Sequence, residues 1–146
     1  MNGDYAKILR RLEAMPVWHK IADPAIGWLA SKTTGWTADS FSGGLEVDFS
    51  AVVPVGTKAV RVAIQLVGDG AADYPFVWWR PSGDANVSNT PSSSNEEAFK
   101  LHRHTTATTN TVFVAVLWLS ADYKVQIAID DTGGNVYIAY PVEWLG

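Results

Sequence analysis

The chain has 146 residues, of which 47% are hydrophobic and 18% are charged, and its net charge at pH 7 is -4. This length suits one domain with its own hydrophobic core, so folding requires neither a disulfide nor a metal, and the composition excludes a disordered chain. Nucleic acid is not an expected partner because no basic run is longer than Arg10-Arg11, and the absence of cysteine excludes a thiolate nucleophile.

The N-terminus predicts one short amphipathic helix, which Asp4 can cap and Pro16 ends. Its apolar residues recur at helical spacing: Tyr5, Ile8, Leu9, Leu12 and Met15. A helix this short is marginal alone and must dock its apolar stripe, either on its own domain or on copies of itself around a symmetry axis. We favour copies. The segment lacks the order of a secretory signal, so we expect no export.

We divide the chain into two parts. Residues 1–35 form the helix and a neck used for oligomerisation, and residues 36–146 form a β-sandwich head. From Ile26 onward the hydrophobic period changes to two, and turn residues interrupt it at short intervals. Alternating hydrophobic residues predict strands at 44–49, 60–66, 76–80, 99–102, 111–119, 123–129 and 136–144. The predicted fold is all-β, an antiparallel sandwich or jelly roll of about eight strands led by the helix.

The strand at 111–119 is apolar on both faces. It is far shorter than the ~20 residues that a membrane helix needs, so we expect no membrane insertion. In a two-layer protein, a second apolar face needs a cover, either the N-terminal segment or a neighbouring subunit. We favour a subunit, and we assign Phe113 and Leu117 to that contact together with the helix stripe.

Several patterns that can carry catalysis are incomplete. His102-Arg103-His104 resembles half of the metal-binding HxH of cupins, but positions 105–110 contain no carboxylate, and the remaining histidine, His19, lies in the neck. The serines show no G-x-S-x-G elbow, and no phosphate-binding glycine loop follows a strand. We therefore expect no enzyme, no metal and no cofactor.

The residues that remain for ligand binding surround an aromatic strand. Trp78 and Trp79 must point to opposite faces of their sheet, and a flat ring rimmed by charged groups suits a saccharide. The candidate set is Trp78, Trp79, Arg80, Asp69, Asp73 and Tyr74, beside a polar loop from Pro81 to Glu97. The competing interpretation, which we favour for the two tryptophans, is that one is buried in the core and the other beneath a subunit.

The stretch 35–66, GWTADSFSGGLEVDFSAVVPVGTKAVRVAIQL, resembles small phage and prophage virion proteins of the tail-fibre and receptor-binding type. Their pattern D-[LF]-S-x-x-V-P-x-G-x-K-A-V is matched by Asp48-Phe49-Ser50, Val53-Pro54, Gly56 and Lys58-Ala59-Val60. FVWWRP at 76–81 and the final Val142-Glu143-Trp144 extend the likeness over most of the β region. These motifs specify strands and turns rather than catalytic residues.

The resemblance implies a non-enzymatic phage structural protein, made in the host cytoplasm and carried in the virion. It implies a homotrimeric fibre or spike head whose N-terminal helices bundle, with a host-surface glycan or another virion protein as partner. The alternative is a carbohydrate-binding module or lectin of a cellular system, which works as a monomer. Mass in solution distinguishes the two.

Overall fold

The computed structural model describes residues 3–68, 76–90, 99–102, 110–130 and 133–146. In this part of the chain one helix, α1 (Gly3–Glu13), confirms the helix predicted from the apolar spacing. Ten strands follow it: β1 (Trp18–Lys20), β2 (Trp28–Lys32), β3 (Leu45–Asp48), β4 (Ala59–Val67), β5 (Phe76–Pro81), β6 (Phe99–His102), β7 (Asn110–Trp118), β8 (Lys124–Ile129), β9 (Asn135–Ala139) and β10 (Glu143–Leu145).

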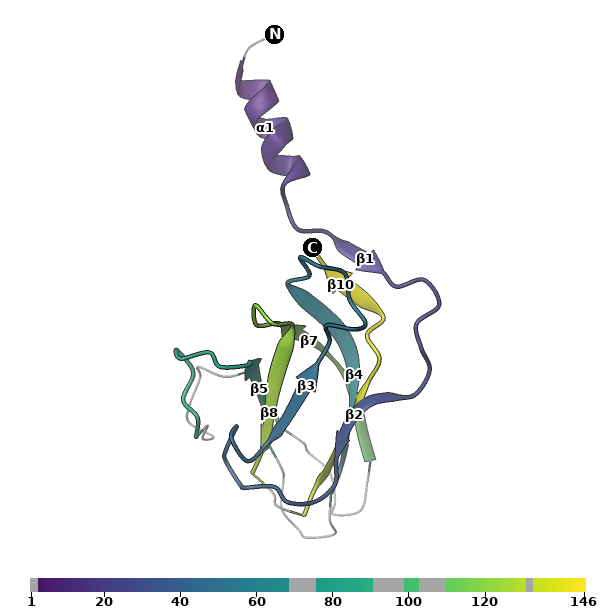
Figure 1. Cartoon of the computed structure of the whole chain (residues 1–146), viewed down its shortest axis with the longest axis vertical. Coiled ribbons are helices and arrows are strands. Elements are labelled where there is room, and N and C mark those ends of the chain that lie inside the picture. Colours follow the sequence, from purple (N-terminus) through teal and green to yellow (C-terminus); the bar gives the residue numbers. More distant parts are fainter. Residues whose placement is uncertain (1–2, 69–75, 91–98, 103–109, 131–132) are drawn as a thin grey trace.

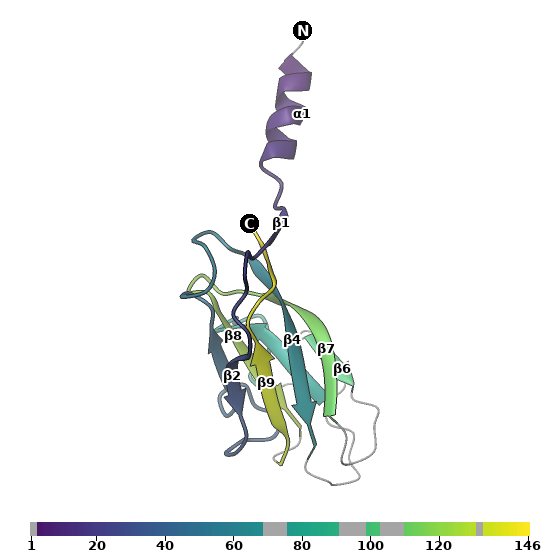
Figure 2. The ribbon, with the colours of Figure 1, turned by 90° about the vertical axis from the view of Figure 1, so that its right-hand side faces the viewer.

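The strands pair in a nested antiparallel order. β5 pairs β6, β4 pairs β7, β3 pairs β8 and β2 pairs β9, and successive pairs alternate between two facing sheets. One sheet has the order β2-β9-β4-β7 and is called the β4 sheet below; the other, β3-β8-β5-β6, is called the β5 sheet. Figures 1 and 2 show these two layers. This nesting is the topology of a jelly roll, so the predicted fold class is confirmed.

The β4 sheet is extended by β1 and β10. β9 pairs the second half of β4 and β10 pairs the first half, with Pro141 in the break between them, and β1 then pairs β10. β1 and β2 therefore belong to the head, which corrects the expected neck ending at residue 35. The sequence did not reveal them because β1 has three residues and a register shift between Trp28 and Ala30 disturbs the alternation of β2.

The core lies between the two sheets and consists of the alternate residues that the strand periods predicted. β4 supplies Val60, Val62, Ile64 and Leu66, each at most 1% exposed. The opposing strands supply Val47, Val77, Val125, Ile127 and Ile129. Each such side chain contributes about 1.5–3 kcal/mol through removal from water, so this double row holds the layers together.

α1 projects away from both sheets beyond the end where β1 and β10 meet (Figures 1 and 2). The backbone re-enters the head at Val17, whose N–H donates to the carbonyl of Gly146 at 2.9 Å and whose carbonyl accepts from Gly146 N at 3.2 Å. The helix is thus joined to the sheet by residues 14–16 alone. No helix among the described residues combines the length and the apolar character needed to cross a membrane.

Candidate interaction surfaces

The expected aromatic platform on β5 is not exposed. Trp78 and Trp79 do point to opposite faces of the β5 sheet, but they are 1% and 8% exposed. Trp79 lies in the core, with its ring 6.3 Å from that of Phe113. Trp78 lies on the outer face, where Phe41 and Val87 of the same chain pack over it. The burial of both rings corrects their assignment to a ligand. One ring lies in the core, as the favoured interpretation predicted, but the other is covered by the chain's own loops rather than by a subunit.

Arg80 has a structural role beside Trp78. It is 7% exposed and its guanidinium lies 4.4 Å from the centre of the Phe41 ring. It donates to Gln126 Oε1 at 3.0 Å, to the Val87 carbonyl at 2.6 Å and to Asn89 Oδ1 at 3.0 Å. Burial lowers the pKa of Arg80 from its usual range. Its donors hold the 82–90 loop on the sheet, so the expectation that Arg80 contacts a ligand is corrected as well.

The other predicted ligand residues, Asp69, Asp73 and Tyr74, lie outside the described residues, as do residues 91–97 of the predicted loop. Along the sequence, Asp69, Asp73 and Tyr74 lie between the end of β4 and the start of β5. Their assignment stays a prediction.

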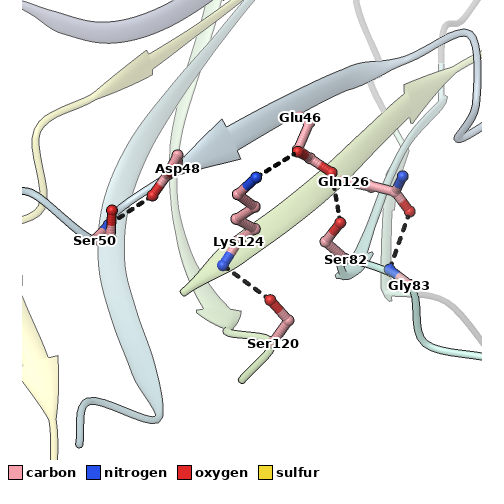
Figure 3. Close-up of polar contacts among 8 residues, drawn as sticks. All are labelled: Glu46, Asp48, Ser50, Ser82, Gly83, Ser120, Lys124 and Gln126. Atoms are coloured by element: carbon pink, nitrogen blue, oxygen red, sulfur yellow. Dashed lines mark hydrogen bonds and ion pairs between the residues drawn. The ribbon is translucent and has the colours of Figure 1, made fainter. Parts of the chain in front are cut away.

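A row of polar side chains crosses the outer face of the β5 sheet (Figure 3). Lys124 Nζ donates to Glu46 Oε1 at 3.2 Å, and Ser82 Oγ donates to Glu46 Oε2 at 2.6 Å. The hydrogen bonds from Ser82 and then Lys124 lower the pKa of Glu46, and Glu46 raises the pKa of Lys124. Gly83 N donates to Gln126 Oε1 at 3.5 Å. Each contact joins neighbouring strands or the following turn, so this row stabilises the sheet and its edge.

An open pocket of about 180 Å³ lies between the β1–β2 connection and the break before β10. Its lining is largely aliphatic and consists of Ile21, Asp23, Pro24, Ala25, Val52, Tyr140 and Pro141. Within the described ranges, no three His, Cys, Asp or Glu side chains are grouped as a metal would require. Asp23 is the one carboxylate in an otherwise largely apolar lining. The pocket therefore suits the binding of an aliphatic group better than acid–base catalysis, which needs a second titratable partner.

The apolar stripe of α1 is open to solvent. Ile8 is 55% exposed and Leu9 40%. Met15, 58% exposed, lies beyond the end of α1 in the connection, so its assignment to the helix stripe is corrected. Val17, 54% exposed, continues the apolar surface to the start of the head. The side chains of Tyr5 and Leu12, the other members of the predicted stripe, are outside the described residues. A helix of 11 residues with this much exposed apolar surface is not stable by itself in water, so the stripe is a candidate contact.

The second apolar surface is the outer face of β7, where Val112, Val114 and Trp118 are 61%, 66% and 43% exposed. Phe113 and Leu117 lie on the inner face of β7, where their cross-strand partners in β4 are Ile64 and Val60. Leu117 is fully buried and Phe113 packs against the core, so their assignment to a subunit contact is corrected. Because both faces of this strand are apolar, its sequence could not distinguish the inner face from the outer one.

Comparison with known proteins gives a distant structural likeness. No protein-family model matches the chain, and no curated protein sequence matches it. Among solved structures, the Tobacco streak virus coat protein in its C2 crystal form is similar, with 13% identity, 88% of each chain covered and a TM-score of 0.33. A structure of the coat protein dimer of the same virus shows 15% identity, 88% coverage of each chain and a TM-score of 0.35. The jelly-roll assignment above depends on the strand pairing and not on this likeness.

Proposed function

We propose that this chain is a non-enzymatic structural protein of a phage virion, a fibre or spike head in which three copies associate through α1. The observation that carries the proposal is the position of the helix, which stands clear of the jelly roll with Ile8 and Leu9 exposed. The resemblance of residues 35–66 to tail-fibre proteins supports the virion role and the threefold arrangement.

Copies of α1 are better partners for this stripe than the head of the same chain. Residues 14–16 are the whole connection between the helix and Val17, which is hydrogen-bonded to Gly146. The helix stands clear of both sheets (Figures 1 and 2), and helices from several copies can meet on an axis beyond the head. Bundling then removes Ile8 and Leu9 from water, and each contributes about 1.5–3 kcal/mol when fully buried.

Recognition of a host-surface glycan or another virion protein is assigned to the end of the head opposite the helix. β4 ends there at Val67, which lies opposite Asn110 of β7 and Asn135 of β9. The predicted ligand residues Asp73 and Tyr74 follow β4 closely in the sequence. In a trimer held by its helices, this end faces away from the bundle, and connecting segments on a rigid scaffold are common binding sites.

Mass in solution tests the assembly. We expect light scattering of the chain to give the mass of a trimer, three times the 15.9 kDa chain mass, or a multiple of the trimer mass. Ile8→Asp should reduce the mass, because a charge in a buried helical seam is costly. Ala6→Asp is the matched control, since it adds the same charge on the other side of the helix and should leave the mass unchanged. A wild-type monomer would contradict the trimer and favour the carbohydrate-binding alternative.

A glycan array tests the recognition half of the proposal. We expect the full chain to bind a glycan and Asp73→Ala to bind it at least tenfold more weakly. Asp122→Ala is the control because Asp122 is exposed in the turn before β8. If Asp73→Ala binds as well as wild type does, the assignment of this end of the head is wrong.

A further inference from the structure

β7 is an edge strand of the β4 sheet, and it is long and regular. β7 pairs β4 over nine residues, from Asn110 opposite Val67 to Trp118 opposite Ala59, and the register does not shift. Among the described residues, β4 is its one strand partner. Within the described ranges, the other edge of β7 therefore presents an unbroken row of backbone donors and acceptors.

β7 also lacks the features by which proteins protect such edges. Edge strands are usually blunted by charged side chains, proline or a bulge. The sequence of β7, NTVFVAVLW, contains no charged residue and no proline. The opposite edge of the same sheet carries Lys20 on β1 and Lys32 on the bulged β2, and the edge strand β3 carries Glu46 and Asp48.

The face beside this edge is apolar as well. Val112 and Val114 are more than half exposed, and Val116 follows them on the same face. In β4, Ala63 lies opposite Val114, while Arg61 and Gln65 lie opposite Val116 and Val112. The apolar surface is therefore the outer face of β7 itself, next to its free edge. An apolar face next to an open edge is the combination that strand addition from another molecule buries.

We propose that β7 pairs antiparallel with β7 of a second copy of this chain about a twofold axis, joining two β4 sheets into one continuous sheet. A twofold contact places a surface against its own copy, so a charged edge such as β3 would bring like charges together, and the uncharged β7 does not. With Val114 opposite its copy, Val112 lies opposite Val116, and every outer pair near the axis is Val against Val.

This contact adds to the proposed function without depending on it, because it uses no residue of α1. If the helices also bundle, the chain has a threefold contact at the N-terminal helix and a twofold contact on the head. Two contacts of different symmetry link trimers to one another, which a virion component can use to build a larger closed or extended structure.

Four versions of this chain separate the two contacts: wild type, Ile8→Asp, Val114→Lys and the double variant. We expect Ile8→Asp to leave a dimer, Val114→Lys a trimer and the double variant a monomer in sedimentation velocity. Val55→Lys is the matched control because Val55 is 93% exposed in a turn, and it should change no mass. A monomeric Ile8→Asp protein would overturn the β7 contact. A dimeric Ile8→Asp protein with a monomeric Val114→Lys protein supports β7 and contradicts the helix bundle instead.

Hydrogen exchange tests whether the contact is strand pairing rather than packing of faces. In the Ile8→Asp dimer we expect amides of β7 to exchange at least tenfold more slowly than in the monomeric double variant. Face packing would cover Val112 and Val114 but leave the edge amides open to solvent. Equal exchange rates in β7 would overturn the strand pairing even if a dimer formed. Similar circular dichroism of the two variants establishes that both remain folded.

Discussion

The two sheets of this jelly roll have similar inner faces but different outer faces. The β5 sheet carries a tryptophan, Trp78, on its outer face and covers it with Phe41 and Val87 of its own loops. The β4 sheet leaves Val112 and Val114 open to water. A large aromatic residue on an outer face is therefore a weaker sign of a binding surface than an uncovered aliphatic strand, because the chain itself can supply the cover.

The cover over the β5 sheet depends on close approach and on one buried cation. Gly44 lies so near β8 that a Cβ there would be 2.0 Å from the carbonyl oxygen of Ile127, which excludes any side chain at this position. Arg80 fixes the second covering loop through the Val87 carbonyl and Asn89. The described part of the β4 sheet has no equivalent loop over β7, which leaves that face available to another molecule.

The largest difference between the sheets is expected from tryptophan truncation. Trp78→Ala should lower the free energy of unfolding by about 3–5 kcal/mol, because it empties a filled site under Phe41. Trp118→Ala removes a ring that is already 43% exposed and should cost about 1 kcal/mol. Urea unfolding at equal protein concentration measures both. Equal losses would contradict the contrast between a covered and an uncovered outer face.

The next effect concerns the loop that provides the cover. Arg80→Met should lower the free energy of unfolding by about 2–4 kcal/mol, because the Val87 carbonyl and Asn89 lose a buried donor. It should also increase protease cleavage in the 82–90 loop. Arg10→Met, on the exposed face of α1, is the control and should change the free energy by less than about 0.5 kcal/mol. A loop equally resistant to protease without Arg80 would show that Phe41 and Val87 suffice.

Local pattern was enough to predict the helix and the strands that form the core. Strict alternation at 44–49 and 60–66 predicted β3 and β4 because each has one buried and one polar face. β1 and β2 were missed because a three-residue strand and a bulged strand show no such period. Strand identity thus followed from the sequence wherever one face was buried over at least four residues.

The candidate surfaces were harder to predict because they depend on contacts between distant residues. Trp78 is hidden by Phe41, which no local rule places over it. The outer face of β7 was identified as a strand needing a cover, but the register with β4 decides that Val114 and not Leu117 is outside. The roles of Asp69, Asp73 and Tyr74 stay predictions from the sequence.

The smallest expected effect lies in the polar row of the β5 sheet, which protects an edge rather than filling a core. Glu46→Gln removes the carboxylate that accepts from Lys124 and Ser82. The side chains of Glu46 and Lys124 are 44% and 36% exposed, so solvent screens the pair. The loss of stability at pH 7 should therefore be smaller than for Trp78→Ala or Arg80→Met. Asp39→Asn, at another exposed carboxylate, serves as the control.

The pH dependence of this loss identifies its cause. Because the pKa of Glu46 is lowered below its ordinary value of 4.5, its contribution is present above that value and is lost as pH falls through the folded-state pKa. The gap between wild type and Glu46→Gln in urea unfolding should therefore narrow from pH 7 to pH 3, and 1 M salt should narrow it at pH 7. A gap that stays constant with pH and salt would mean that Glu46 acts through packing, and the charged row would then not be what distinguishes the β3 edge from β7.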